Sequence, residues 1–145
     1  MAGRMQSIVD VHVLFFNEQD ECLFIRRANT GYKDGQYSLV AGHLEPGETI
    51  KGCAVREAAE EVGAIVDAND LVLSGVMRRD ADQNRISFFL TCHRWQGQII
   101  NNEPDKCDDL VWQPLPHLPD PMVDYVQEAL KSICKSEILS DFIPG

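Results

Sequence analysis

The chain of 145 residues has the length of one ordinary domain and carries 13 Lys and Arg against 23 Asp and Glu, a formal net charge of −10. A charge of this sign argues against a nucleic-acid partner held through a broad phosphate-binding surface, so an anionic substrate would need a local positive charge or a metal ion. The content of 44% hydrophobic and 25% charged residues is typical of a globular protein, and no apolar run approaches the length of a bilayer span. We therefore expect residues 1–145 to form a single domain without a membrane partner.

The N-terminal segment and the cysteines predict a cytoplasmic protein. The segment MAGRMQSIVDVHVLFF does not resemble a signal peptide, because Asp10 and His12 interrupt its apolar part. The five cysteines are odd in number and contain no C-x-x-C pair, which favours neither a disulfide framework nor a zinc site. We expect reduced thiols that are mostly buried.

The first part of the chain predicts three strands. Residues 9–15 alternate between Val or Phe and other side chains, which is the period of a half-buried strand. The polar segment NEQDE is interpreted as a hairpin turn that leads to a partner strand at 22–27. A glycine-containing loop at 31–36 precedes a short predicted strand at 37–41.

A helix is predicted from Thr49, its N-cap, to Val62, with Gly63 as the residue that ends it. Gly52 near the start of this helix costs ~1 kcal/mol relative to Ala. Apolar residues at helical spacing predict one stripe that faces the core: Val55, Ala58, Ala59 and Val62.

The second half of the chain predicts a hairpin of two strands, 71–79 and 85–95, around the polar turn DADQN. The loop NNEPDKCDD then precedes a short strand at 110–112, and a proline-rich segment leads to an amphipathic helix at about 122–136. Strands mixed with helices and hairpins indicate an α/β or α+β fold in which helices cover a mixed sheet.

Three carboxylates, Glu57, Glu60 and Glu61, fall within about one turn at the end of the first predicted helix, opposite its apolar stripe. No Lys or Arg follows any of them at a distance of four residues. Like charges at this spacing repel by ~0.2–0.5 kcal/mol per pair, and the helix dipole disfavours anions at this end. A solvated acidic face is the alternative interpretation. A divalent cation would resolve the conflict, because Mg²⁺ and Mn²⁺ prefer clustered oxygen ligands and can bridge to substrate phosphates.

The loop before this helix and Arg56 within it support a metal site. The loop AGHLEPGE contains two glycines and a proline, so its backbone can bend sharply and present carbonyl oxygens to a metal. Arg56 lies beside the carboxylates, where its guanidinium could orient one of them or contact phosphate.

The segment that begins at Gly42 resembles the Nudix box, G-x5-E-x7-R-E-U-x-E-E-x-G-U, in which U is a bulky aliphatic residue. Every fixed position matches. The two U positions hold the smaller residues Ala58 and Ala64, and Ile65 is the candidate for supplying the missing bulk. The resemblance extends along the whole chain, because strands and helices are predicted in the order that the family uses.

The resemblance implies a Nudix fold, an α/β/α sandwich with a mixed β-sheet, and hydrolysis of a nucleoside diphosphate linked to another group with Mg²⁺ or Mn²⁺ as cofactor. It implies the following site residues: Glu57, Glu60 and Glu61 as metal ligands, one of them also a general base through water; Glu48 and Arg56 as supporting residues; and a backbone carbonyl near Ala41 or Gly42.

Further candidates lie outside the box helix. Glu103 is a candidate ligand or base, because small triphosphatases of the family carry a carboxylate in a comparable loop, and the alternative is a solvated acidic loop. Arg26 and Arg27 are candidates for phosphate contact, and His43 lies beside the site with Gly42. The remaining histidines are expected at the surface or in hydrogen bonds: His12, His93 and His117. Four aromatic residues could stack a base, although such residues on strands are usually core: Tyr32, Tyr37, Phe88 and Trp95.

We therefore expect an enzyme that acts on a small-molecule nucleotide, foremost a pyrophosphohydrolase that converts a nucleoside triphosphate into a monophosphate and pyrophosphate. ADP-ribose, nucleotide sugars and dinucleoside polyphosphates are alternative substrates, because specificity lies in loops outside the box. A nucleotide-binding module without turnover is the alternative of another class, and the complete set of carboxylates argues against it. A homodimer is left open.

Overall fold

Two β-sheets and two helices make up the structure, a computed structural model that describes residues 3–143. The strands are β1 (Ile8–Phe15), β2 (Cys22–Arg27), β3 (Tyr37–Ser38), β4 (Val40–His43), β5 (Leu71–Asp80), β6 (Asn84–Cys92), β7 (Cys107–Gln113) and β8 (Leu139–Phe142). The helices are α1 (Ile50–Val62) and α2 (Asp124–Cys134), and short 3-10 turns lie at Ala68–Asp70 and Leu115–His117. The larger sheet has the order β4-β1-β6-β5-β8 and the smaller sheet has the order β3-β2-β7.

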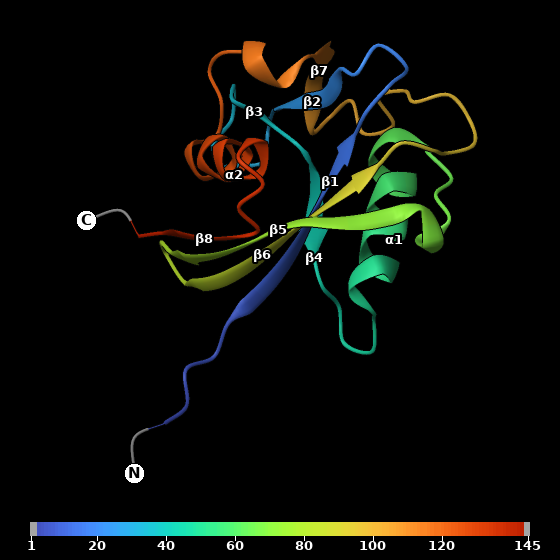
Figure 1. Ribbon diagram of the computed structural model, residues 1–145. Coiled ribbons are helices and arrows are strands. Elements are labelled where there is room, and N and C mark those ends of the chain that lie inside the picture. Colours follow the sequence, from blue (N-terminus) through green and yellow to red (C-terminus); the bar gives the residue numbers. More distant parts are fainter. Residues whose placement is uncertain (1–2, 144–145) are drawn as a thin grey trace.

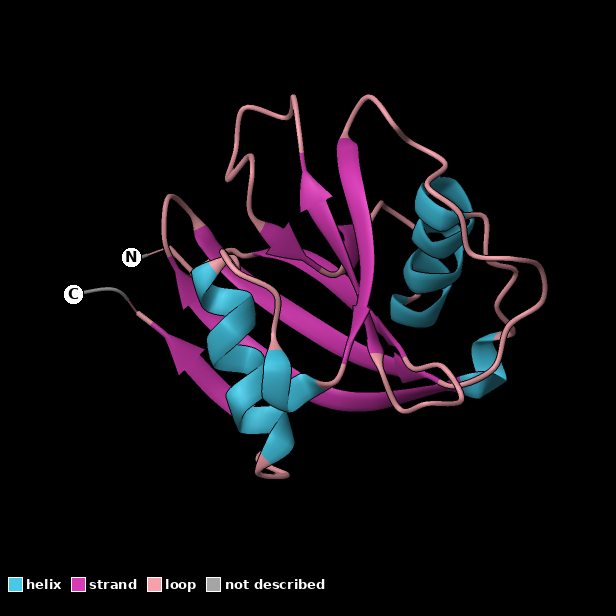
Figure 2. Cartoon of the chain, turned by 90° about the horizontal axis from the view of Figure 1, so that it is seen from above, coloured by secondary structure: helices cyan, strands magenta, loops and turns pink. Residues whose placement is uncertain are grey.

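The larger sheet is mixed and has a helix on each face. β1 pairs in parallel with β6 and antiparallel with β4. Val11 and Val13 of β1 pack in one core cluster with α1, whereas Leu14 packs in a second cluster with α2. Figures 1 and 2 show the two helices on opposite sides of the sheet. This arrangement confirms the predicted α/β/α sandwich with a mixed sheet.

β1 is buried on both faces, so the prediction of a half-buried strand at 9–15 is wrong. Asp10 and His12 alternate with the apolar residues as predicted, yet they are only 5% and 0% exposed. The reason is that α2 covers the face that carries them, since the ring of Tyr125 from α2 lies against His12. β1 is therefore a central strand whose polar residues are enclosed.

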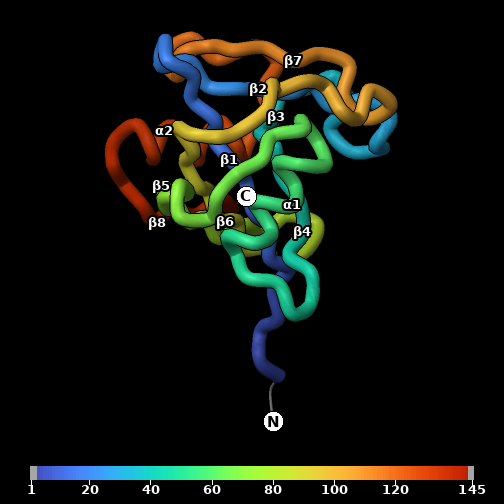
Figure 3. The backbone as a smooth tube through the Cα atoms, turned by 90° about the vertical axis from the view of Figure 1, so that its right-hand side faces the viewer, coloured from blue at the N-terminus to red at the C-terminus, as the bar shows by residue number. Residues whose placement is uncertain are grey.

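The predicted hairpin between the first two strands is also wrong. The segment NEQDE forms a turn closed by the bridge between Phe16 and Cys22, but β1 and β2 belong to different sheets and do not pair along their length within residues 3–143. The predicted strand at 37–41 likewise consists of two strands, because β3 pairs with β2 whereas β4 pairs with β1. The chain thus crosses between the sheets at Leu39, and Figures 1 and 3 show the smaller sheet beyond one end of the larger one.

The second half follows the predicted order with shifted boundaries. The hairpin of β5 and β6 around DADQN is confirmed, although β6 ends at Cys92. β7 begins at Cys107, so the end of the predicted loop belongs to a strand. α2 is shorter than the predicted helix at each end. β8 was not predicted, because a four-residue edge strand with Leu139 exposed carries little periodic signal.

Both predicted caps of α1 are confirmed. The hydroxyl of Thr49 accepts a hydrogen bond from the N–H of Gly52 at 2.9 Å, and Gly63 has the left-handed φ of 70° that suits glycine. A Cβ on Gly52 would lie 2.8 Å from the Thr49 hydroxyl oxygen, so the absence of a side chain leaves room for the cap.

The buried face of α1 is rotated from the predicted stripe. The buried residues of the helix are Cys53, Ala54, Ala58 and Val62. Val55 is half-buried and Ala59 is exposed, because α1 packs against β4 as well as β1 and turns part of its acidic face inward. Ala64 is fully buried whereas Ile65 is 64% exposed, so Ile65 does not supply the bulk expected there.

All five cysteines are free, and four of them are buried, as predicted; Cys134 is exposed. Among residues 3–143, no helix combines the length and the apolar composition that a bilayer-spanning helix requires.

Candidate active site

Two cavities meet beside β4, the edge strand of the larger sheet. The carboxylate cavity, about 290 Å³, is lined among others by four glutamates and a lysine: Glu57, Glu60, Glu61, Glu103 and Lys106. The arginine cavity, about 460 Å³, is lined among others by Asp10, His12, Arg79, Arg85 and Tyr125. Arg27, Ala41 and Gly42 line both cavities, so the two adjoin.

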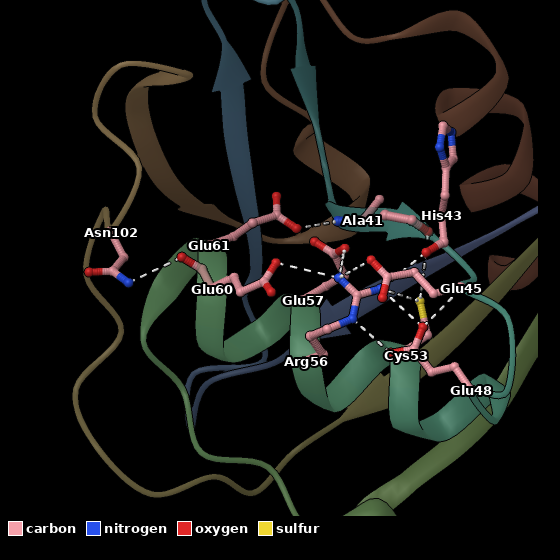
Figure 4. Close-up of polar contacts among 11 residues, drawn as sticks. Ala41, His43, Glu45, Glu48, Cys53, Arg56, Glu57, Glu60, Glu61 and Asn102 are labelled. Carbon is pink, nitrogen blue, oxygen red and sulfur yellow. Dashed lines mark hydrogen bonds and ion pairs between the residues drawn. The ribbon is translucent and has the colours of Figure 1, made fainter.

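Glu61 reaches from α1 to the backbone of β4. Its carboxylate accepts a hydrogen bond from the N–H of Ala41 at 3.1 Å, as Figure 4 shows. Burial raises the pKa of Glu61 well above its usual range, and the neighbouring Glu57 and Glu103 raise it further. A buried carboxyl beside two other carboxylates takes up a proton unless a cation offsets the charge.

Gly42 is required by the position of Glu57. The carboxylate of Glu57 occupies the space that a side chain on Gly42 would take, and an ideal Cβ would overlap its Oε1 atom. A glycine is needed at position 42 because of the space that Glu57 occupies, and not because of the backbone conformation, since Gly42 is not among the glycines with positive φ.

We expect Gly42→Ala to lower the free energy of unfolding by ~1–3 kcal/mol, because the added methyl group must displace the Glu57 carboxylate. Thermal unfolding of the metal-free protein measures this cost. The matched control is the same substitution in a Glu57→Ala background, where the space is free and the further cost should be small. Equal costs in both backgrounds would show that Glu57 does not impose the glycine.

Arg56 organises the acidic residues around it. Its Nε and Nη2 donate to the two oxygens of Glu48 at 2.7 and 3.0 Å, and its Nη1 donates to Glu57 at 2.7 Å and to Glu60 at 3.4 Å (Figure 4). Nη2 also donates to the carbonyl oxygen of His43 at 3.1 Å. All five N–H groups of the guanidinium are thus used, so Arg56 orients the carboxylates rather than contacting phosphate.

The predicted repulsion among the three glutamates is therefore partly offset by Arg56, contrary to the expectation that only a metal ion could relieve it. No cation follows the three glutamates, but Arg56 precedes them and pairs with Glu57 and Glu60. The hydrogen bonds from Arg56 also lower the pKa of Glu48 to about 2. Among residues 3–143, Glu61 forms no ion pair and instead accepts a hydrogen bond from the N–H of Ala41 on β4.

Glu103 lines the carboxylate cavity together with Glu57, Glu60 and Glu61. The N–H groups of Lys106 and Cys107 donate to its carbonyl oxygen, and this tight turn holds its half-buried side chain toward α1. Asp108, farther along, instead pairs with Arg26 at 2.6 Å. The acidic residues of this segment therefore have different environments.

The donor set of the carboxylate cavity fits a divalent cation. Within residues 3–143, no three His, Cys, Asp or Glu side chains are already arranged as a metal-binding group. The cavity nevertheless gathers four carboxylates, and oxygen ligands of this kind suit Mg²⁺ or Mn²⁺. Burial and the neighbouring carboxylates raise the pKa of Glu61, and a cation beside it would offset that negative charge.

The structure places some of the residues expected to contact substrate at the cavities, but not all of them. Arg27 and Gly42 line both cavities, and His43 lines the arginine cavity with its Nε2 3.3 Å from Arg85. Arg26 lines neither cavity, because it pairs with Asp108 and lies over the ring of Tyr37. The structure therefore gives no support to Arg26 as a phosphate contact.

Of the four aromatic candidates, Tyr32 alone lines the arginine cavity, where it is 44% exposed. Tyr37 is buried and donates its hydroxyl to Asp109, and Trp95 stacks on Trp112. Phe88 lines neither cavity. Tyr32 is thus the aromatic residue placed to contact a ligand.

The arginine cavity contains a buried polar network that the sequence analysis missed. Arg79, only 4% exposed, donates from Nη2 to Asp10 at 2.9 Å and from Nε to Ser87 at 3.0 Å. His12 bonds through Nε2 to the hydroxyl of Tyr125 at 2.8 Å, and burial lowers the pKa of His12 to about 4. The signal in the sequence was the presence of Asp10 and His12 within an otherwise apolar strand.

A comparison with protein families confirms the resemblance: the model described as NUDIX domain matches residues 7–133. The chain belongs to the NUDIX domain family. The 8-oxo-dGDP phosphatase NUDT18 of Mus musculus is 34% identical over 115 residues, which are 77% of this chain and 34% of that protein. The NAD-capped RNA hydrolase NudC of Stutzerimonas stutzeri (strain A1501) is 29% identical over 108 residues, which are 74% of this chain and 37% of that protein. This Nudix chain thus spans about a third of the length of these curated relatives.

Solved structures show the same fold. A MutT NUDIX hydrolase from Burkholderia pseudomallei superposes with a TM-score of 0.78 at 22% identity, covering 87% of this chain and 97% of that one. The MutT protein from Methanosarcina mazei Go1 also has a TM-score of 0.78, at 19% identity, covering 92% of this chain and 97% of that one. The predicted Nudix fold is confirmed.

Proposed function

We propose that this Nudix domain hydrolyses a phosphoanhydride bond of a nucleotide, with the phosphates in the carboxylate cavity and the nucleoside in the arginine cavity. The observation that supports this assignment is the shared lining of the two cavities by Arg27, Ala41 and Gly42. A single ligand that passes β4 can therefore reach both. Tyr32 lies at the nucleoside end, where its ring offers a stacking surface.

In this proposal Glu57, Glu60 and Glu61 hold Mg²⁺ or Mn²⁺, and Glu103 is a further ligand or the base that takes a proton from water. A bound cation would neutralise phosphate charge and lower the pKa of water. Arg56 positions Glu48 and Glu57 through its hydrogen bonds. Arg27 and Lys106 are the cationic side chains that line the same cavity, so we assign phosphate binding to them.

The substrate that we propose first is a nucleoside triphosphate, cut to a monophosphate and pyrophosphate. The relative named as an 8-oxo-dGDP phosphatase supports a nucleoside diphosphate as the second candidate. ADP-ribose, nucleotide sugars and dinucleoside polyphosphates are the other alternative substrates. The relatives named as NAD-capped RNA hydrolases support a dinucleotide as one more alternative. The absence of a nucleic-acid partner stays a prediction.

A nucleotide panel tests the proposal. Purified residues 1–145, which we propose form one catalytic domain, are incubated with nucleoside triphosphates, diphosphates, ADP-ribose and NAD⁺, and the products are separated by chromatography. We expect release of a nucleoside monophosphate with Mg²⁺ or Mn²⁺ and none with excess chelator. Hydrolysis that persists unchanged in chelator, or binding without turnover of any member, would contradict the proposal.

A further inference from the structure

A short segment between β6 and β7 closes the C-terminal end of α1. The last carbonyl groups of an α-helix have no N–H partner within the helix itself. The N–H of Ile100 donates to the carbonyl oxygen of Val62 at 3.0 Å. The N–H of Asn102 donates to the carbonyl oxygen of Glu61 at 3.0 Å, and its side-chain amide donates to that of Glu60 at 3.1 Å (Figure 4). The last three carbonyl groups of α1 thus receive their donors from this one segment.

Asn101 fixes the turn that carries Glu103. Its Oδ1 atom accepts a hydrogen bond from the N–H of Glu103 at 3.1 Å, and its Nδ2 atom donates to the carbonyl oxygen of Cys107 at 2.7 Å. The carbonyl oxygen of Glu103 itself accepts from the N–H groups of Lys106 and Cys107 at 2.9 and 3.0 Å. Because an amide side chain both accepts and donates, Asn101 holds the two ends of the turn together.

The other side of this turn is attached to the loop that follows β2. The N–H of Ala28 donates to the carbonyl oxygen of Lys106 at 2.9 Å. The side-chain amide of Asn29 donates to the carbonyl oxygen of Asp105 at 3.0 Å, and Asn29 has a left-handed φ of 55° that asparagine tolerates better than most residues. The turn is therefore held between α1 and the loop after β2.

The charge of the carboxylate cavity explains why Glu103 needs to be held there. Glu103 lines the cavity with three other glutamates, and carboxylates that share a site repel one another. A loop residue can relieve this repulsion by moving into solvent. The contacts that oppose this movement come from neutral amide groups, which add no charge to the cavity. They also end on the main chain of Glu60 and Glu61, so they do not occupy the carboxylate of either residue.

Building on the function proposed above, we infer that Asn101 and Asn102 are positioning residues that hold Glu103 at the proposed metal site. Asn102 fastens the segment to the end of α1, and Asn101 sets the turn that follows it. The position of Glu103 relative to the carboxylates of α1 is thereby set by the end of the helix itself. Neither asparagine lines the carboxylate cavity or the arginine cavity, so their effect on catalysis passes through Glu103 and not through contact with substrate.

A double-mutant cycle tests whether Asn102 acts through Glu103. Asn102→Ala should lower kcat about fivefold and change KM less than about twofold, since it removes one hydrogen bond that places a carboxylate of the site. Asn102 is exposed, so the variant is expected to fold. In a Glu103→Gln background the same substitution should change kcat less than about twofold, because the carboxylate that it positions is already absent. An unchanged kcat for Asn102→Ala, or an equal fall in both backgrounds, would overturn the inference.

Amide hydrogen exchange of the metal-free protein tests the positioning without requiring turnover. We expect the amides of residues 101–107 to exchange about fivefold faster or more in Asn102→Ala and in Asn101→Ala, because the turn opens more often. Asn69→Ala is the matched control and should exchange like the wild type, because Asn69 is exposed and lines neither cavity. Unchanged exchange at 101–107 in either asparagine variant would overturn the inference. A wild-type protein that hydrolyses no nucleotide would contradict only the proposed hydrolysis, and the exchange measurement would then decide the inference.

Discussion

Glu61→Gln is expected to lower kcat by about 100-fold or more with saturating Mg²⁺, which corresponds to ~2.7 kcal/mol in the activation free energy. Glu61 is tied to β4 by the N–H of Ala41, and burial raises its pKa. Replacing it with a neutral amide of similar shape removes a ligand while keeping an acceptor for that N–H. Steady-state kinetics on the substrate found in the nucleotide panel measure the effect.

The control for Glu61→Gln is Glu137→Gln, because Glu137 is exposed and lines neither cavity. Its kcat should stay within about twofold of the wild type. An unchanged kcat for Glu61→Gln would remove Glu61 from the proposed metal site.

The same substitution should stabilise the metal-free protein in a pH-dependent way. The pKa of Glu61 is raised in the folded state, so folding favours its protonated form. The folded metal-free protein then loses stability as pH rises above about 4.5, the usual pKa of the group, toward the raised folded value. The Gln variant lacks this loss, and its advantage in melting temperature should grow over that range. A melting temperature below that of the wild type at every pH would indicate a structural role for the Glu61 charge.

Glu103→Gln is expected to lower kcat by about tenfold or more, or ~1.4 kcal/mol in the activation free energy. Its carboxylate lies in the carboxylate cavity close enough to Glu61 to raise that residue's pKa. It belongs to a loop, so its loss should affect turnover more than the stability of the metal-free protein. Kinetics and thermal unfolding of the same preparation separate the two effects.

Asp105→Asn is the matched control for Glu103→Gln. Asp105 lies on the same loop, but it is exposed and does not line the cavity. Small and equal effects of the two substitutions on kcat would leave Glu103 as surface charge.

The features that could be predicted from the sequence are those that depend on fixed local spacing. Thr49 and Gly63 begin and end α1 through contacts within a few residues, and Glu57 and Glu61 share one side of the helix because they are four residues apart. The carboxylate of Glu57 meets β4 because Gly42 leaves room for it, a packing contact that the spacing of the box does not by itself predict.

The arginine cavity could not be predicted in the same way, because its residues come from strands far apart in the sequence. Asp10 and Arg79 form a buried pair across β1, β6 and β5, and only the parallel register of β1 with β6 brings them together. The alternation of β1 predicted the side on which Asp10 lies but not the helix that covers it. Likewise, the inward turn of Glu61 depends on the packing of α1 against β4.

The most direct test of the two-cavity account is a crystal structure with Mn²⁺ and a nucleotide analogue whose phosphoanhydride bridge cannot be cleaved. The anomalous signal of Mn²⁺ should lie among Glu57, Glu60 and Glu61, and the base should lie against Arg79 and Asp10, with the phosphates passing Gly42. A metal ion bound away from these carboxylates, or a base outside the arginine cavity, would contradict the account.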